Sequence, residues 1–162
     1  MPIHVVRLGS PRLEGEGLRI GTVRRPPRGV PKREFASRDF YDVWLPDLAP
    51  SEELVKLGQA AGDERAWRTF VRRYRAEMSR AEASRLLDLL AALSRQTSLS
   101  VGCYCAEERR CHRSVLRELL AGRGAEIAVP PAAGGCPGRP GMRRSRRAGE
   151  SEASPARSPD AL

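Results

Sequence analysis

The sequence has only two lysines, few aromatic residues and no long hydrophobic run. No stretch approaches the roughly twenty apolar residues of a membrane span. The amino end also lacks the apolar core of a secretory signal. We therefore expect a cytoplasmic protein with no membrane contact. Aromatic residues make up 5% of the chain, and this scarcity disfavours a stacking platform for single-stranded nucleic acid.

Cysteine is scarce as well, with four in 162 residues. Disulfide frameworks belong to small secreted domains, so we expect these cysteines to be reduced thiols. Cys136 stands in a C-terminal tail and is read as incidental, whereas Cys103, Cys105 and Cys111 lie close together in the sequence.

Positive charge is abundant and comes almost entirely from arginine. The chain carries a net charge of +9 and has a pI near 10.4, which favours contact with nucleic acid or other polyanions. Residues 130–162 are rich in Pro, Gly, Ser and Arg and show no apolar period, so we predict a disordered tail. Residues 1–129 are then one folded domain.

Strand and helix patterns alternate along residues 1–129. The expected strands are 3–8, 18–23, 41–45, 99–105 and 126–129. Helices are expected after Ser51, after Asp63, at a Ser79–Glu82 capping box and from Cys111 onward. Strand, helix, strand order is typical of right-handed crossovers in a parallel sheet. The prediction is a three-layer α/β domain with a mostly parallel sheet of about five strands and flanking helices.

The segment VGCYCAEERRCHRS, residues 101–114, concentrates reactive side chains where an apolar strand gives way to a helix. Unpaired N–H groups at such a helix start bind anions and lower the pKa of a nearby thiol. Cys105, Cys111 and His112 are therefore the candidate catalytic residues. Strand alternation favours Cys103 as a small core residue.

A second polar cluster, residues 24–28, follows the second expected strand and holds three arginines around two prolines. An arginine in the first turn of a helix, such as Arg113, opposes the helix dipole, which suggests an anion nearby. If the strands are parallel neighbours, both loops open at one edge of the sheet, where ligands bind in open α/β sheets. The candidate anion-binding residues are Arg24, Arg25, Arg28, Lys32, Arg113 and Ser114.

A zinc site is an alternative interpretation of the same cluster, with Cys103, Cys105, Cys111 and His112 as ligands. Adjacent Cys111 and His112 lack the usual spacing of paired zinc ligands, so we predict no metal and no other cofactor. A redox disulfide between Cys105 and Cys111 also stays open. One between Cys103 and Cys105 is disfavoured, because in an extended strand their Cα atoms lie about 7 Å apart.

Several motifs together resemble a known family. They are VRRPP-R-G (23–29), WLP (44–46) with LAPS (48–51), Trp67 with FVRRYR (70–75), and Cys105-Ala106-Glu107 with CHRS (111–114). This combination resembles the domain of unknown function 488 (DUF488) family, in its YeaO-like branch, over residues 1–129. The resemblance implies a small cytosolic α/β protein. Where the family's strand before Arg24 often carries an aspartate, this chain has Thr22 and Val23.

Two functional hypotheses of different class remain open. The first is a thiol-dependent enzyme with an anionic small-molecule substrate, using Cys105 or Cys111 as nucleophile and His112 as base. The second is a nucleic-acid or nucleotide-binding module that uses the same arginines and the basic tail. The sequence does not indicate an oligomeric state.

Overall fold

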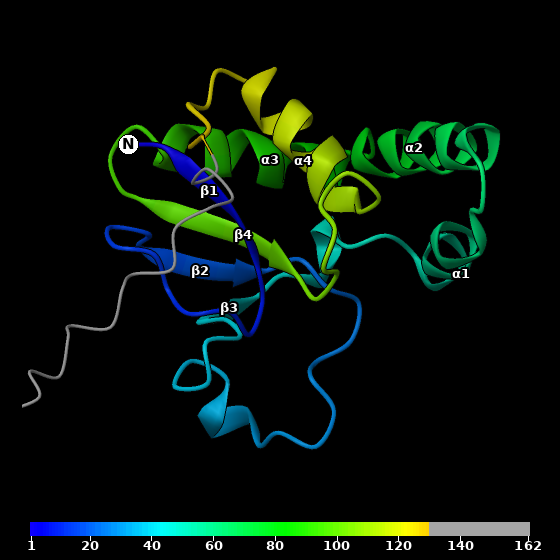
Figure 1. Cartoon of the computed structure of the whole chain (residues 1–162). Helices are drawn as coiled ribbons and strands as arrows, with labels where there is room; N and C mark the ends of the chain where they lie inside the picture. Colours follow the sequence, from blue (N-terminus) through cyan, green and yellow to red (C-terminus); the bar gives the residue numbers. More distant parts are fainter. Residues whose placement is uncertain (130–162) are drawn as a thin grey trace, which may run out of the picture. The chain divides into compact units, whose positions relative to one another are not determined.

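Four short strands form a parallel sheet in the order β1-β4-β2-β3 (Figure 1). They are β1 (Ile3–Arg7), β2 (Leu18–Gly21), β3 (Val43–Trp44) and β4 (Leu99–Cys103). The structure is a computed structural model that describes residues 1–129. The expected fifth strand contributes only a single parallel bridge, between Ile127 and Ile3. The α/β fold with a parallel sheet is therefore confirmed, with four strands in place of about five. The tail predicted for 130–162 lies outside the described residues.

The helices are α1 (Glu52–Ala60), α2 (Glu64–Met78), α3 (Ala81–Leu93) and α4 (His112–Ala121), with 3-10 turns η1 (Lys32–Glu34) and η2 (Pro46–Leu48). Two predicted caps are confirmed, because the Ser51 and Asp63 side chains accept hydrogen bonds from the first turns of α1 and α2. The Ser79 cap was wrong. Its hydroxyl instead donates back to the carbonyl of Arg75, and α3 starts without a side-chain cap. None of the helices in residues 1–129 is long and apolar enough to cross a bilayer.

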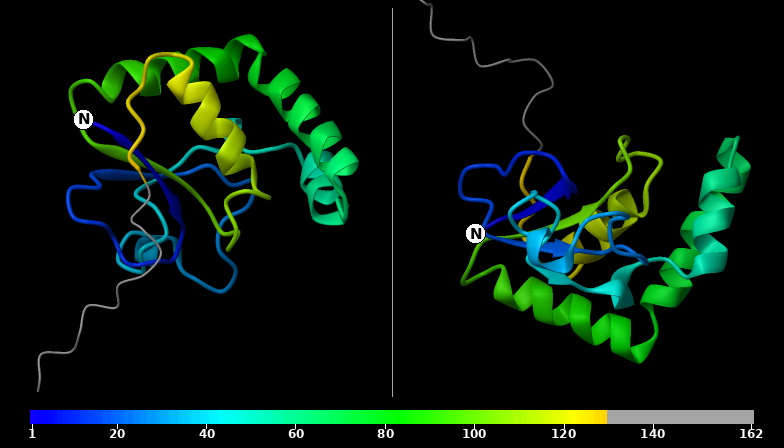
Figure 2. Two further views of the ribbon diagram at one scale, coloured as in Figure 1. Left: turned by 45° about the horizontal axis from the view of Figure 1, so that its top comes forward. Right: turned by 90° about the horizontal axis from the view of Figure 1, so that it is seen from below.

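One face of the sheet packs against helices and forms the main core. Ile20 and Val101 of the strands belong to the same buried hydrophobic cluster as the helix residues Tyr74, Leu87 and Leu116. The α4 helix contacts both β4 and α3, while α2 and α3 run in an arc along the same side (Figure 2). Because burying such side chains is the main driving force of folding, this layer holds α4 against β4.

Loops and η1 cover the opposite face of the sheet (Figure 1). The strands accommodate them with glycine, since a Cβ on Gly21 would lie 2.3 Å from the Tyr41 ring and one on Gly102 would lie 2.4 Å from Leu8. Every residue of β4 is buried, so loop side chains seal this face as completely as helices seal the other.

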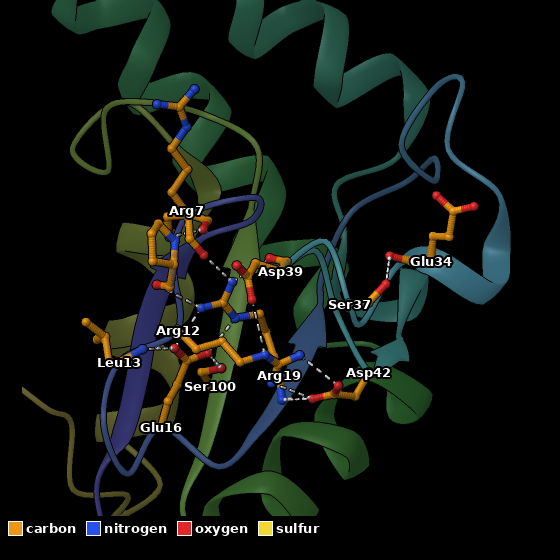
Figure 3. A network of polar contacts seen from close by, with 12 residues as sticks. Arg7, Arg12, Leu13, Glu16, Arg19, Glu34, Ser37, Asp39, Asp42 and Ser100 are labelled. Carbon is orange, nitrogen blue, oxygen red and sulfur yellow. Dashed lines mark hydrogen bonds and ion pairs between the residues drawn. The ribbon is translucent and has the colours of Figure 1, made fainter.

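A buried ion pair fastens these loops to the sheet (Figure 3). The guanidinium of Arg19 donates to both carboxylate oxygens of Glu16, and its Nη1 also donates to the carbonyls of Ser10 and Asp39. Ser100 donates a further hydrogen bond of 2.7 Å to Glu16. Burial alone raises the pKa of Glu16, but these hydrogen bonds outweigh it and lower that pKa.

Candidate thiol site

A pocket of about 880 Å³ opens beyond the carboxyl ends of β2 and β4. One wall is the arginine-rich loop 23–28, another is the segment 103–105 with 110–112, and a third comes from α1 and α2. The two loops singled out in the sequence therefore share one opening. Pockets of this size hold small molecules, and the edge is the one where parallel sheets bind ligands.

Three thiols meet at this pocket. β4 ends at Cys103 and the backbone bends at Tyr104, which brings the Sγ atoms of Cys103 and Cys105 to 3.7 Å. The expectation that these two side chains stay apart was wrong, because it assumed an extended strand to residue 105. Cys103 and Cys111 are 7% and 3% exposed, whereas Cys105 is exposed at the pocket. A reagent from solvent thus meets Cys105 first.

The neighbouring thiols stabilise Cys105 as a thiolate. A hydrogen bond from Cys103, a second from Cys111 and the positive charge of Arg113 lower the pKa of Cys105 to about 3. The pKa of Cys103 is raised, since its thiol proton is engaged in these bonds and its sulfur is buried. The charge of the cluster therefore resides on the sulfur that faces solvent.

A hydrogen bond to Thr22, the residue that follows β2, holds His112 in one tautomer. Its Nε2 lies 2.8 Å from the carbonyl oxygen of Thr22, and because a carbonyl only accepts, Nε2 carries the proton. The other ring nitrogen, Nδ1, faces Cys111 Sγ at 3.7 Å and is free to accept a proton. The ring edge packs on buried Tyr74, with centroids 5.6 Å apart. A hydrogen bond from Cys103, together with His112, lowers the pKa of Cys111.

Sequence reasoning did not assign a role to Thr22. Its hydroxyl donates to the carbonyl of Gly102 at 3.0 Å and lies 3.3 Å from His112 Nε2. The motif resemblance did point to this position, because Thr22 stands at one of the two positions where the resemblance implies an aspartate. The pairing of β2 with β4, which no local pattern specifies, brings this position to His112.

The predicted arginines divide into structural and available groups. Arg24 donates to the carbonyls of Ala49 and Pro50, and Arg25 pairs with Glu52 at 2.7 Å, so both guanidinium groups are engaged. Arg28 lines the pocket, is exposed, and has no hydrogen bond or ion pair with any residue of 1–129.

Three predicted anion-binding residues do not line the pocket. Arg113 is buried, and its guanidinium donates a hydrogen bond of 2.7 Å to the carbonyl of Cys105. Its Nε has no hydrogen-bond partner within the described part of the chain. Ser114 donates to the carbonyl of Cys111 at 2.9 Å. Lys32 lies in η1 and is exposed. Within the chain, the positive charge of Arg113 acts on Cys105, whose pKa it helps to lower.

Two cations of the pocket were missed. Lys56 projects from α1, and Arg110 lies with its guanidinium carbon 5.9 Å from the ring centroid of Trp67. Arg110 directly precedes Cys111 in the sequence but was not assigned to the site, whereas Lys56 is far from the thiols in the chain and reaches the opening only through the tertiary structure. With Arg28, they give the pocket positive charge on several walls.

The buried end of the cluster has the chemistry of a soft-metal site. Ligand atoms of Cys103, Cys111 and His112 all lie within 4.8 Å of one another. The sequence argument against adjacent Cys111 and His112 fails in three dimensions, since their Sγ and Nδ1 atoms, 3.7 Å apart, suit bonds of about 2.3 Å and 2.1 Å to one tetrahedral zinc ion.

A model of the active DUF488-N3 subclade, DUF488-N3a, matches residues 3–124. No curated protein and no solved structure gives a significant match to the chain.

Proposed function

Since the chain belongs to the DUF488 family, we propose that it is a thiol-dependent enzyme whose substrate carries a phosphate or carboxylate group. The observation that carries the proposal is the exposed Cys105 thiol, in hydrogen-bond contact with two buried thiols, at the wall of a pocket with unpaired cations. We also propose a cytoplasmic location, where cellular reductants keep such thiols free.

In the proposed reaction, Cys105 Sγ attacks an electrophilic atom of the substrate. A bond from sulfur to that atom forms, and the leaving group departs with its bonding electron pair and takes a proton from the Cys111–His112 pair. Water then attacks the same atom, Cys105 leaves as the thiolate, and the proton released by water returns to His112. The Nε2 bond to Thr22 supports this role, because it keeps Nδ1 turned toward Cys111.

Anion recognition in this proposal rests on Arg28 and Lys56. They stand on different walls of the pocket, and neither forms an ion pair within residues 1–129. Arg24 and Arg113 serve the same end indirectly, by holding the loops that carry Arg28 and Cys105. A guanidinium forms bidentate bonds to phosphate or carboxylate, which suits Arg28 to this task.

Two alkylating reagents that differ in charge test the proposal. Iodoacetate is an anion and iodoacetamide is neutral, yet both alkylate a thiolate in the same way. With Cys136→Ser protein, the ratio of iodoacetate to iodoacetamide rate constants at Cys105 should exceed the ratio for free cysteine. Arg28→Ala and Lys56→Ala should each lower the protein's ratio by about twofold to fivefold, the effect of one charge several ångströms away.

The matched control is Arg85→Ala, which removes an exposed arginine of α3 that is not part of the pocket. It should leave the ratio unchanged. A ratio equal to that of free cysteine, insensitive to Arg28→Ala, would contradict an anion-binding thiol site.

A zinc centre is the second candidate, favoured by the convergence of Cys103, Cys111 and His112. It predicts one zinc ion per chain after purification without chelator, and a fall in melting temperature when the metal is removed. The thiol-enzyme proposal predicts a substoichiometric metal content and full titration of the described thiols without a chelator.

A further inference from the structure

The Cys103–Cys105 pair combines an accessible sulfur with a protected one. Cys105 is exposed, Cys103 is 7% exposed, and their Sγ atoms are 3.7 Å apart in a thiol hydrogen bond. An oxidant arriving through the pocket meets the exposed Cys105, and the Cys103 sulfur, 3.7 Å from it, is shielded from solvent. This is the arrangement of a peroxide-reactive cysteine with a resolving partner.

We propose that Cys105 is a site of reversible oxidation by a hydroperoxide, resolved by Cys103 as an intramolecular disulfide. The Cys105 sulfur attacks the peroxide, the O–O bond breaks, and the products are the Cys105 sulfenic acid and an alcohol, or water from hydrogen peroxide. Cys103 Sγ then attacks the sulfenic sulfur, the S–S bond forms and water leaves. The peroxide gains the two electrons that the two thiols lose. The proposal does not depend on the catalytic role of Cys105.

The structure favours Cys103 over Cys111 as the resolving residue. Bond formation requires the Cys103 and Cys105 sulfurs to move from 3.7 Å to about 2.05 Å, and only Tyr104, at a backbone bend, separates them in the chain. Cys111 is the N-cap residue of α4, and its sulfur is directed at His112 Nδ1 at 3.7 Å. A bond to Cys111 would draw a helix start toward the loop.

A tryptic map separates the two pairings. Cleavage after Arg95 and Arg109 places Cys103 and Cys105 in one peptide, 96–109, whereas Cys111 falls in the peptide 111–113. Cys136→Ser protein would be treated with one equivalent of hydrogen peroxide, denatured, blocked with N-ethylmaleimide and digested without reductant. The expected product is peptide 96–109 with a mass lower by two hydrogens and with no bound maleimide. Cys111, in peptide 111–113, should carry one maleimide. Dithiothreitol should restore both thiols.

Matched variants test the resolving role. Cys103→Ala should prevent the disulfide and leave a Cys105 sulfenic acid that dimedone traps, while Cys111→Ser should still form the internal disulfide. In the Cys136→Ser protein with all three other cysteines present, peptide 96–109 cross-linked to 111–113, or Cys105 oxidised to sulfinic acid without any disulfide, would overturn the proposal. This readout needs no substrate, so it stands apart from the alkylation ratio that tests the proposed function.

Discussion

Alkylation of Cys105 by iodoacetamide should keep a nearly constant rate from about pH 5 to pH 9, because the thiol is ionised throughout this range. With a pKa of about 3, roughly 99% of Cys105 is thiolate at pH 5. A free cysteine with a pKa of about 8.5 holds roughly 0.03% thiolate at the same pH. The structure thus predicts a plateau where an ordinary thiol shows a steep rise.

The absolute rate follows from two opposing factors. A thiolate of lower pKa is a weaker nucleophile, and a Brønsted coefficient of about 0.45 across the gap between the two pKa values reduces its reactivity roughly 300-fold. Multiplied by the thiolate fractions, this makes Cys105 about tenfold faster than free cysteine at pH 5 and roughly two-hundredfold slower at pH 9. The two profiles should cross near about pH 6.

The assay follows alkylation of peptide 96–109 over time in Cys136→Ser protein, with fragmentation separating Cys103 from Cys105 and glutathione as the reference thiol. Cys103→Ala removes the hydrogen bond that contributes most to the lowered pKa of Cys105, so its profile should regain an inflection at higher pH. An inflection between pH 8 and 9 in the protein that retains Cys103 would refute the reasoning, because it would mean that the neighbouring thiols do not stabilise the thiolate.

Three further predictions concern single side chains. Arg19→Met strands the buried Glu16 carboxylate and should lower the free energy of unfolding in urea by about 3–5 kcal/mol, whereas the exposed Arg28→Met should change it by less than about 0.5 kcal/mol. Cys105→Ser should lower the melting temperature although Cys105 is exposed, because it removes the counter-charge of buried Arg113. Cys105→Asp keeps a negative charge and should lower the melting temperature less. Equal melting temperatures for the two variants would contradict this pairing. Arg28→Ala should leave retention on immobilised duplex DNA unchanged at each salt concentration if the pocket serves a small anion, and earlier elution would favour the nucleic-acid-binding hypothesis.

Local patterns were sufficient for most of the helices. Ser51 and Asp63 precede amphipathic segments, and each caps its helix as its position indicates. Ser79 has the same local signature but lies between two helices, where its hydroxyl can serve the end of one or the start of the next. In the structure it donates to the carbonyl of Arg75 and serves the end of α2. Ser79 keeps helical dihedrals as the C-cap of α2, and the extended N-cap position of α3 falls one residue later, on Arg80.

The place of the site was predictable, but its internal geometry was not. Parallel strands end at one edge of the sheet, so the loop after residue 23 and the segment from Cys103 were expected at the same edge, and the pairing of β2 with β4 brings them together there. The approach of the Cys103 and Cys105 sulfurs depends on the strand ending two residues early, at a bend. Alternation of apolar residues continued through Cys105, so the pattern predicted a longer strand and separated thiols.

The arginines show why composition is a poor guide to the charge of a site. A count of side chains treats Arg19, Arg24 and Arg28 alike, yet the first neutralises a buried carboxylate and the second ties down two carbonyls. Of these three, Arg28 alone presents to the pocket donors that no residue of 1–129 engages. Arg113 is different again, because its positive charge helps to lower the pKa of Cys105 in the same chain. The electrostatics that ionise Cys105 are therefore separate from those that would bind a substrate, and substitutions can change one without the other.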